Sequence, residues 1–338
     1  MQDRNSKYHI VYASDEGFAE VMGISILSLL DNNRDAEDIV VYILDSGITP
    51  ESRQKINGIF LEYSRPEPVW ISARNISDEL NIEVETDRGS LSQYARLFVS
   101  SVLPAELERV LYLDCDIIIN ASIDELWNID MEGNTIAALK DAFSTKYRPN
   151  IGLKGDDIMF NSGVMLIDLS KWKSGNIEQK LMKFISDRKG VIQQGDQGAL
   201  NAVLSYETYC FDPRFNSQTV FYDFSYKEMQ IYRDPPEYYS EQEIKRAVEE
   251  PVIIHFTTSF LSERPWVKGC AHRYTDKWLH YKKLSPWADT PLREPKKAGT
   301  VKRMYLGFIK VMPRGFAVWF SGMLHRYGRP FLFKIKNR

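Results

Sequence analysis

The sequence predicts an α/β fold with a mainly parallel sheet. Its first half alternates short β-rich segments with helical patterns, an order typical of parallel strands joined by helices. Val21, Ile24, Leu27 and Leu30 recur every three or four residues, so one face of a helix over 18–30 should pack on the sheet. Strands are expected at 9–13, 39–44, 69–71, 109–113 and 136–139, and helices at 18–30, 50–63 and 92–101.

The second half is less regular. Residues 164–169 and 252–256 have the continuous apolar pattern of buried strands, and 197–204 have that of a helix. Residues 218–251 are rich in tyrosine, proline and charge, and Asp234-Pro-Pro-Glu237 interrupts any regular element. We interpret this stretch as an inserted loop region suited to recognition.

Composition limits the class of protein. The 338 residues are 43% hydrophobic and 12% aromatic, enough for one large domain or two modest ones and unlike a disordered chain. The polar start leads into the first strand without an apolar leader segment, which predicts no signal peptide. Cys115, Cys210 and Cys270 are an odd number at wide spacing, so we expect reduced thiols and a cytoplasmic location.

The most informative segment is Leu113-Asp-Cys-Asp116, where an apolar strand ends on two aspartates. Carboxylates in an apolar setting are costly unless a positive group neutralises them. Mg²⁺ or Mn²⁺ does so and can still bind substrate phosphates, and ligands of open α/β sheets collect beyond the carboxyl ends of strands. Taken alone, however, the motif is short, and two solvated aspartates at a strand end are the more frequent explanation.

Further polar motifs lie at the ends of predicted elements. Asp15 follows the first strand, where it could contact a base or ribose or simply cap the next helix. Asp196 and Gln197 begin a helix; capping explains Asp196 but does not require Gln197. Phe160-Asn-Ser-Gly163 is a polar turn that enters a strand, and His255 ends one, where a histidine is more often packed than metal-bound.

Taken in order, these motifs resemble glycosyltransferase family 8, a group of retaining enzymes. The resemblance covers about residues 8–285 and implies a GT-A fold, in which a Rossmann-like nucleotide-binding half with a mixed, mainly parallel sheet is joined to an acceptor-binding region. It is carried by Ala13-Ser-Asp-Glu16, Tyr94-Ala-Arg-Leu97, Leu113-Asp-Cys-Asp116, Phe160-Asn-Ser-Gly163, Asp196-Gln197 and Ile254-His-Phe256.

The resemblance also implies roles for individual residues. Asp114, Asp116 and His255 would hold Mn²⁺ or Mg²⁺. The catalytic residues at the reacting sugar would be Gln197, Asp196 and Asp141. The implied nucleotide-sugar contacts are Ala13, Asp15, Arg96, Asp114, Cys115, Asp116, Asn161, His255 and Arg264. Cys115, between the two aspartates, is by itself more typical of a small packing residue.

The segment after His255 departs from the family pattern. The family often continues with Gly-x-x-Lys-Pro-Trp, but here the segment is three residues longer and has Thr258 and Arg264 in the glycine and lysine positions. Arginine clamps a phosphate at least as well as lysine does, so Arg264 is expected to contact the donor. Thr258 receives no role.

The implied reaction is transfer of glucose or galactose from a UDP-sugar to a glycan or glycolipid acceptor with retained configuration. The amide of Gln197 is a poor nucleophile, which favours front-face attack by the acceptor hydroxyl over a double displacement. Two alternatives stay open. One is a GT-A module that binds the nucleotide-sugar without transfer; the other is a nucleotidyltransferase, although Ala13-Ser-Asp-Glu16 lacks the basic, glycine-rich character of a phosphate loop.

The C-terminal part differs from the rest in charge. Residues 296–338 hold eleven basic and no acidic residues, leaving 32 basic and 46 acidic residues, a net charge of −14, in 1–295. We therefore expect a catalytic domain over 1–285, a basic aromatic tail over 286–338, and no binding to nucleic acid, which the acidic body would repel.

The tail contains two amphipathic helical patterns. One has Tyr305, Phe308, Ile309 and Met312 on a face; the other has Phe316, Trp319, Phe320 and Met323. The longest uncharged stretch, 315–324, is far short of the roughly 20 residues that cross a bilayer. We expect the tail to lie on an anionic membrane surface, the inner face of the cell membrane. A helix packed on the body is the alternative.

Overall fold

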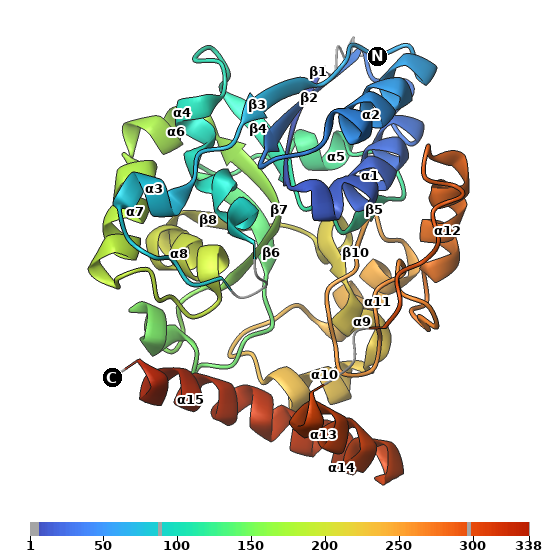
Figure 1. Cartoon of the computed structure of the whole chain (residues 1–338). Helices are drawn as coiled ribbons and strands as arrows, with labels where there is room; N and C mark the ends of the chain where they lie inside the picture. Colours follow the sequence, from blue (N-terminus) through green and yellow to red (C-terminus); the bar gives the residue numbers. More distant parts are fainter. Residues whose placement is uncertain (1–6, 87–89, 296–298, 338) are drawn as a thin grey trace.

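The computed structural model describes residues 7–86, 90–295 and 299–337 (Figure 1). The predicted tail residues Lys296, Lys297 and Arg338 lie outside the described residues. The body is an α/β structure around a large sheet, and the last helices run along one end of it (Figure 1).

The large sheet has seven strands in the order β3-β2-β1-β4-β7-β6-β8. Of these strands only β7 runs antiparallel to its neighbours, so the mainly parallel mixed sheet is confirmed. Their bounds are β1 (Lys7–Ser14), β2 (Asp38–Asp45), β3 (Val69–Ser72), β4 (Arg109–Leu113), β6 (Ile136–Lys140), β7 (Phe160–Asp168) and β8 (Thr208–Cys210).

Helices cover both faces of this sheet because alternate strand residues are apolar on both sides (Figure 1). In β1, Ile10 and Tyr12 belong to one core and Val11 to the other. The first core lies under α1 (Ala19–Asp31), α2 (Pro50–Glu62) and α12 (Thr275–Leu284). The second lies under η2 (Leu91–Phe98), α4 (Val99–Val102), α6 (Leu169–Ser174), α7 (Ile177–Asp187) and α8 (Gly195–Leu204).

A second sheet joins distant parts of the chain. Its three strands are β5 (Ile117–Ile119), β10 (Ile253–His255) and β9 (Ser217–Gln218). β10 is antiparallel to β5, in a register that places His255 opposite Ile117. Shorter helices complete the body: η1 (Glu16–Phe18), α3 (Ile76–Leu80), α5 (Asp124–Trp127), η3 (Arg148–Ile151), η4 (Ser205–Glu207) and η5 (Pro213–Asn216).

Two sequence predictions about local structure were wrong, those for 218–251 and for the turn at Phe160–Gly163. Residues 218–251 are not a loop region but contain α9 (Thr219–Asp223), α10 (Tyr226–Arg233) and α11 (Glu241–Glu249). Both α10 and α11 begin with a capping box, a serine followed three residues later by glutamate. The helical pattern predicted at 92–101 is confirmed, as the 3₁₀ helix η2 followed by the short α4. Phe160 already belongs to β7, so Asn161-Ser-Gly163 is strand and not turn.

The last helices are α13 (Thr300–Val311), α14 (Arg314–Met323), the π-helical turn η6 (Leu324–Gly328) and α15 (Arg329–Lys336). α14 packs on α10 through its small residues, and Gly322 lies so close that an added Cβ would be 2.7 Å from the Ile231 carbonyl oxygen. Its Trp319 side is exposed. Within the described part of the chain, no helix is long and apolar enough to cross a membrane.

Candidate active site

An acidic cluster lies between the two sheets. Asp114 follows β4, Asp116 precedes β5 and His255 ends β10, so the pairing of β10 with β5 brings the histidine to the aspartates. His255 Nε2 is 3.2 Å from Asp116 Oδ1 and 3.9 Å from Asp114 Oδ2. One ligand atom from each residue lies within 4.8 Å of the other two, a spacing suited to a single metal ion.

A hydrogen-bond relay fixes which nitrogen of His255 faces the aspartates. The backbone N–H of Gly163 donates to Asn161 Oδ1 (3.0 Å), so this oxygen is an acceptor. Asn216 Nδ2 donates to the same oxygen (2.9 Å), which leaves Asn216 Oδ1 to accept from His255 Nδ1–H (2.8 Å). Nε2 of the neutral ring is then unprotonated and directed at the carboxylates, the state that a metal ligand needs.

Gly163 makes this close approach possible. A Cβ at this position would clash with His255 Cε1 and would lie 2.8 Å from Asp114 Oδ2. Because β7 passes directly behind the cluster, only a residue without a side chain fits there.

Each aspartate of the cluster also pairs with an arginine. Arg96 Nη2 donates to Asp114 Oδ1 (2.8 Å), and Arg264 Nη1 donates to Asp116 Oδ2 (2.5 Å). The other oxygen of each carboxylate is the one nearest His255 Nε2. The cluster therefore offers one oxygen from each aspartate and one nitrogen to a cation, while buried guanidinium groups balance the remaining charge.

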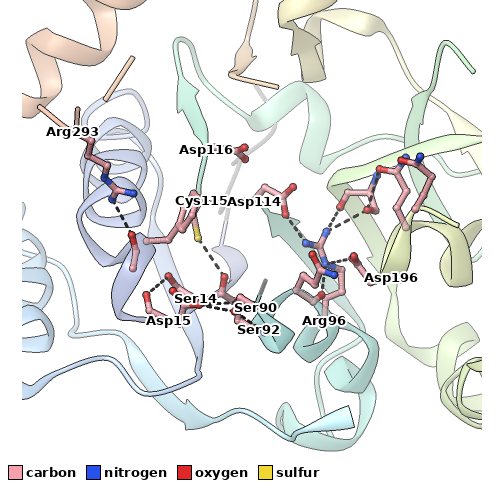
Figure 2. Close-up of a pocket in the computed structure, with 17 residues that line it drawn as sticks. Ser14, Asp15, Ser90, Ser92, Arg96, Asp114, Cys115, Asp116, Asp196 and Arg293 are labelled. Atoms are coloured by element: carbon pink, nitrogen blue, oxygen red, sulfur yellow. Dashed lines mark hydrogen bonds and ion pairs between the residues drawn. The ribbon is translucent and has the colours of Figure 1, made fainter. Parts of the chain in front are cut away.

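Arg96 also connects the cluster to α8. Its Nε lies 3.1 Å from Asp196 Oδ2, and Figure 2 shows the guanidinium group between Asp114 and Asp196. Burial opposes the charge, but the Asp114 carboxylate prevails and raises the pKa of Arg96. Helix capping does not explain Asp196, because Gln194, and not Asp196, occupies the N-cap position of α8.

A cavity of about 450 Å³ opens in front of the cluster (Figure 2). At its far end Asp15 Oδ2 accepts a hydrogen bond from Ser90 Oγ (2.6 Å). Asp15 does not cap the following turn with its side chain, so the capping explanation was wrong here too. The lining residues include the predicted Ala13, Asp15, Arg96, Asp114, Cys115, Asp116, Asp196 and Gln197, together with Ser90, Ser92 and Arg293.

Cys115 is a packing residue that also lines the cavity. Its thiol donates to the carbonyl oxygen of Ala13 (3.3 Å), and burial raises its pKa, so it is inert as a nucleophile at neutral pH.

Gln197 lies between this cavity and a second one. Its Nε2 donates to Asp141 Oδ2 (3.2 Å), and its Oε1 accepts from Asn161 Nδ2 (3.2 Å). Burial raises the pKa of Asp141, against the opposing charge of Arg233. The second cavity, of about 420 Å³, is lined by Asp141, Phe143, Asn161, Gln193, Gln194, Gln197, Gln218, Arg233, Thr257, Thr258, His325, Arg329 and Phe333.

The structure thus brings every predicted site residue to this region. Asp141 and Asn161 face the second cavity, His255 and Arg264 lie behind the first, and the others line the first. Sequence reasoning missed Asn216, Gly163 as a packing requirement, and the cavity residues Arg233, Arg293, His325 and Arg329. No local motif marks Asn216 or Arg233, and the arginines of the last segment were interpreted only as surface charge.

Comparison with known proteins identifies the family. Residues 9–269 match the family model "Glycosyl transferase family 8". The chain belongs to glycosyltransferase family 8. Within the family it is 28% identical over 282 residues to general stress protein A of Bacillus subtilis, covering 82% of this chain and 94% of that protein. It is 25% identical to the lipopolysaccharide 1,2-glucosyltransferase of Escherichia coli, covering 88% of this chain and 84% of that enzyme.

The fold of this family 8 chain is also that of a solved galactosyltransferase. The crystal structure of LgtC with donor and acceptor sugar analogues superposes with a TM-score of 0.68 at 23% identity, covering 86% of this chain and 98% of LgtC. The GT-A fold expected from the sequence is confirmed. Membership of a glycosyltransferase family also disfavours the nucleotidyltransferase alternative.

Proposed function

We propose that this protein is a retaining hexosyltransferase that moves glucose or galactose from a UDP-sugar to a glycan acceptor with Mn²⁺ or Mg²⁺ as cofactor. The observation that carries the proposal is the cluster of Asp114, Asp116 and His255, with Nε2 free to coordinate, at the floor of a cavity sized for a nucleotide-sugar. Hard carboxylate oxygens suit Mn²⁺ and Mg²⁺, and the imidazole nitrogen favours Mn²⁺ over Mg²⁺. The lipopolysaccharide 1,2-glucosyltransferase among its relatives supports a cell-surface glycan as acceptor.

The residues around the cavity suit the parts of such a donor. Asp15, held by Ser90, is an acceptor for ribose hydroxyls or a base N–H at the end away from the cluster. Arg264 is already bound to Asp116 and supplies positive charge where the diphosphate would lie. A bound divalent cation would offset the negative charge that builds on the leaving diphosphate. Asp114, Asp116 and His255 would hold that cation.

The position of Gln197 supports front-face attack. It borders both cavities, so a sugar in the first and an acceptor hydroxyl in the second would meet beside its amide. Its oxygen can stabilise an oxocarbenium-like sugar, but an amide is a poor covalent nucleophile. Mass spectrometry of the protein incubated with donor tests this: a hexose covalently attached at Gln197 or Asp196 would replace front-face attack with double displacement.

Calorimetry tests the donor site directly. UDP, UDP-glucose and UDP-galactose should bind wild type more tightly with Mn²⁺ than without it, and Asp116→Ala should abolish the difference. Asp187→Ala is the matched control, because Asp187 is exposed at the end of α7, where it forms a surface ion pair with Lys183. Equal UDP binding with and without metal, or in wild type and Asp116→Ala, would leave a non-catalytic or metal-independent module as the better explanation.

We also propose that the last helices bind the cytoplasmic face of an anionic membrane. Twelve of the seventeen exposed large hydrophobic side chains in the described chain come from residues 301–335, including Phe316 and Trp319 of α14. Apolar side chains beside exposed lysines and arginines are typical of an interfacial segment. The division into a catalytic domain over 1–285 and a tail over 286–338 stays a prediction.

Liposome co-sedimentation tests the membrane proposal. Phe316→Ser with Trp319→Ser should lower binding to vesicles containing phosphatidylglycerol, whereas Leu61→Ser, which removes an exposed apolar residue from α2, should not. If wild type and the double variant bound these vesicles equally, the aromatic face of α14 would not be the membrane contact.

A further inference from the structure

The second cavity adjoins the first and is lined by residues from distant parts of the chain. Gln194 and Gln197 border both cavities, so a ligand in one would touch a ligand in the other. Asp141 and Phe143 follow β6, Arg233 ends α10, and His325, Arg329 and Phe333 come from the last helical segment. Figure 1 shows this segment running beside α10, so it forms a wall of the cavity as well as an outer surface.

The docking of this wall is specific. Tyr147 Oη donates to the His325 carbonyl oxygen (2.9 Å), and Asn150 Nδ2 donates to the Pro330 carbonyl oxygen (3.0 Å). Arg233 Nη1 lies 2.6 Å from His325 Nε2. Side chains of the body thus hold the backbone on both sides of Arg329.

Two cations that line this cavity form no contact ion pair, although the charge of Arg233 acts on Asp141 across the cavity. Within the described ranges, neither Arg233 nor Arg329 forms an ion pair, whereas the neighbouring Arg326 pairs with Asp234 (3.3 Å) and Arg314 with Glu228 (2.6 Å). Asp141 is the one acidic residue among the described lining residues, and it is buried against Gln197 and Asn161. The cavity therefore has an excess of positive charge on the side formed by α10 and the last segment.

The same wall has unused hydrogen-bonding capacity. Arg233 Nε, His325 Nδ1 and Gln218 Nε2 are buried and have no partner among the described residues. His325 Nε2 lies against the guanidinium donor of Arg233, so its Nδ1 carries the proton and is also a donor. Burial and the surrounding arginines lower the pKa of His325, which keeps the ring neutral. A site with unmet donors and unpaired cations suits a ligand rich in anionic oxygen.

We propose that the second cavity binds the acceptor and that this acceptor carries an anionic group, a carboxylate or a phosphate, held by Arg233 and Arg329. The inference rests on the proposed function, because it identifies the cavity beyond Gln197 as the acceptor side of the reaction. Phe333 offers apolar surface for a sugar ring, and Thr257 and Thr258 offer partners for its hydroxyls. Thr258, which the sequence left without a role, thus contacts the acceptor.

The test compares acceptors that differ only in charge. The probes are methyl glucoside, methyl glucuronide and methyl glucoside 6-phosphate, with the matching galactosides. Binding is measured by saturation-transfer NMR, which needs no turnover, in the presence of UDP and Mn²⁺. The KM of each acceptor probe is also measured, with UDP-glucose and with UDP-galactose as donors. At least one acidic probe should bind about ten- to a hundred-fold more tightly than its neutral counterpart, as expected for charge-assisted hydrogen bonds. The carboxylate and phosphate probes distinguish the two anions.

Arg329→Gln should remove this preference for the acidic probe. Arg329 is exposed on the cavity side of α15, so the variant should fold. Arg233→Gln should also reduce the preference for the acidic probe. Arg303→Gln on α13, outside the cavity, is the control and should keep the preference.

Acidic and neutral probes that bind equally to wild type, or a preference that survives in Arg329→Gln, would overturn the inference. Either result would leave the proposed donor site intact. Conversely, loss of metal-dependent UDP binding would contradict the donor site without affecting the NMR comparison of acceptors.

Discussion

The two cavities differ in how their arginine side chains are paired. In the first, Arg96 and Arg264 are paired with the carboxylates of Asp114 and Asp116, so the site is neutralised by its own residues. In the second, Arg233 and Arg329 form no contact ion pair among the described residues, and Asp141 is the one described carboxylate in the lining. The difference indicates that a cation and a diphosphate can enter the first site together with little change in net charge. The second site, by contrast, gains most from a ligand that brings its own negative charge.

The largest effect that separates the cavities should come from Gly163→Ala. The new methyl group would clash with His255 and push it away from Asp114, so Mn²⁺-dependent UDP binding should fall by at least about 100-fold, and overpacking should cost about 1–3 kcal/mol of stability. Calorimetry measures the UDP binding, and thermal unfolding measures the loss of stability. Gly58→Ala is the control: nothing lies within 4 Å of its Cβ, so this change in α2 should be neutral or slightly stabilising. Unchanged metal dependence in Gly163→Ala would mean that His255 is not a ligand.

Asn216→Ala should weaken Mn²⁺ binding by about 10- to 100-fold. Asn216 is fully buried and accepts from His255 Nδ1–H, so its removal frees the ring to rotate or change tautomer. Asn216→Asp keeps an acceptor for that N–H and should retain more affinity than Asn216→Ala. The Mn²⁺ affinity of both variants is measured by direct titration, with the electron paramagnetic resonance signal of Mn²⁺ as the readout. Equal losses in the two variants would point to a general packing defect instead of a positioning role.

Gly322→Ala should disturb the second cavity alone. An added Cβ would lie 2.7 Å from the Ile231 carbonyl oxygen and 3.0 Å from Tyr232 Cα, and so would force α14 away from α10, whose last residue is Arg233. We expect a stability loss of about 1–3 kcal/mol and a several-fold lower affinity for the acceptor. The affinity for UDP should be unchanged. Gly315→Ala, in the same helix but with nothing within 4 Å, is the control. An equal effect on UDP binding would show that the cavities are not independent.

The smallest effect concerns pH. The hydrogen bond and ion pair with Arg314 lower the pKa of Glu228 from 4.5 to about 2. Because the folded-state pKa is below the unfolded value, this contribution is complete above about pH 4.5 and is lost as the pH falls toward 2. The pair is partly exposed, so Arg314→Gln should cost only about 0.2–1 kcal/mol at pH 6, and less at pH 3. Thermal unfolding at both pH values measures this; a difference that stays constant with pH would exclude the ion pair as its cause.

Much of the body was predictable because its elements carry local signals. The strand ending at Leu113 and the helix containing Val21 show their periodicity in the sequence, and the family motifs predicted the cluster at the strand ends. The capping boxes at Ser225 and Ser240 were equally visible and would have corrected the loop interpretation of 218–251.

The remaining errors have a different origin. Asn161 and Ser162 are polar residues inside β7, and they are stable there because distant partners, Gln197 and Arg96, satisfy their hydrogen bonds. The relay through Asn216 likewise depends on the pairing of β9 with β10, which no local pattern encodes. The tail faces were predicted from large apolar residues, whereas α14 docks through its small ones.

The pairing of β10 with β5 has a consequence for how the protein is made. The two aspartates are synthesised early, next to β4 and β5, but His255 is synthesised 139 residues after Asp116 (255 − 116). A nascent chain that has not yet released residue 255 from the ribosome has an incomplete ligand set. During synthesis the complete ligand set therefore forms only after β10 has been made and has paired with β5.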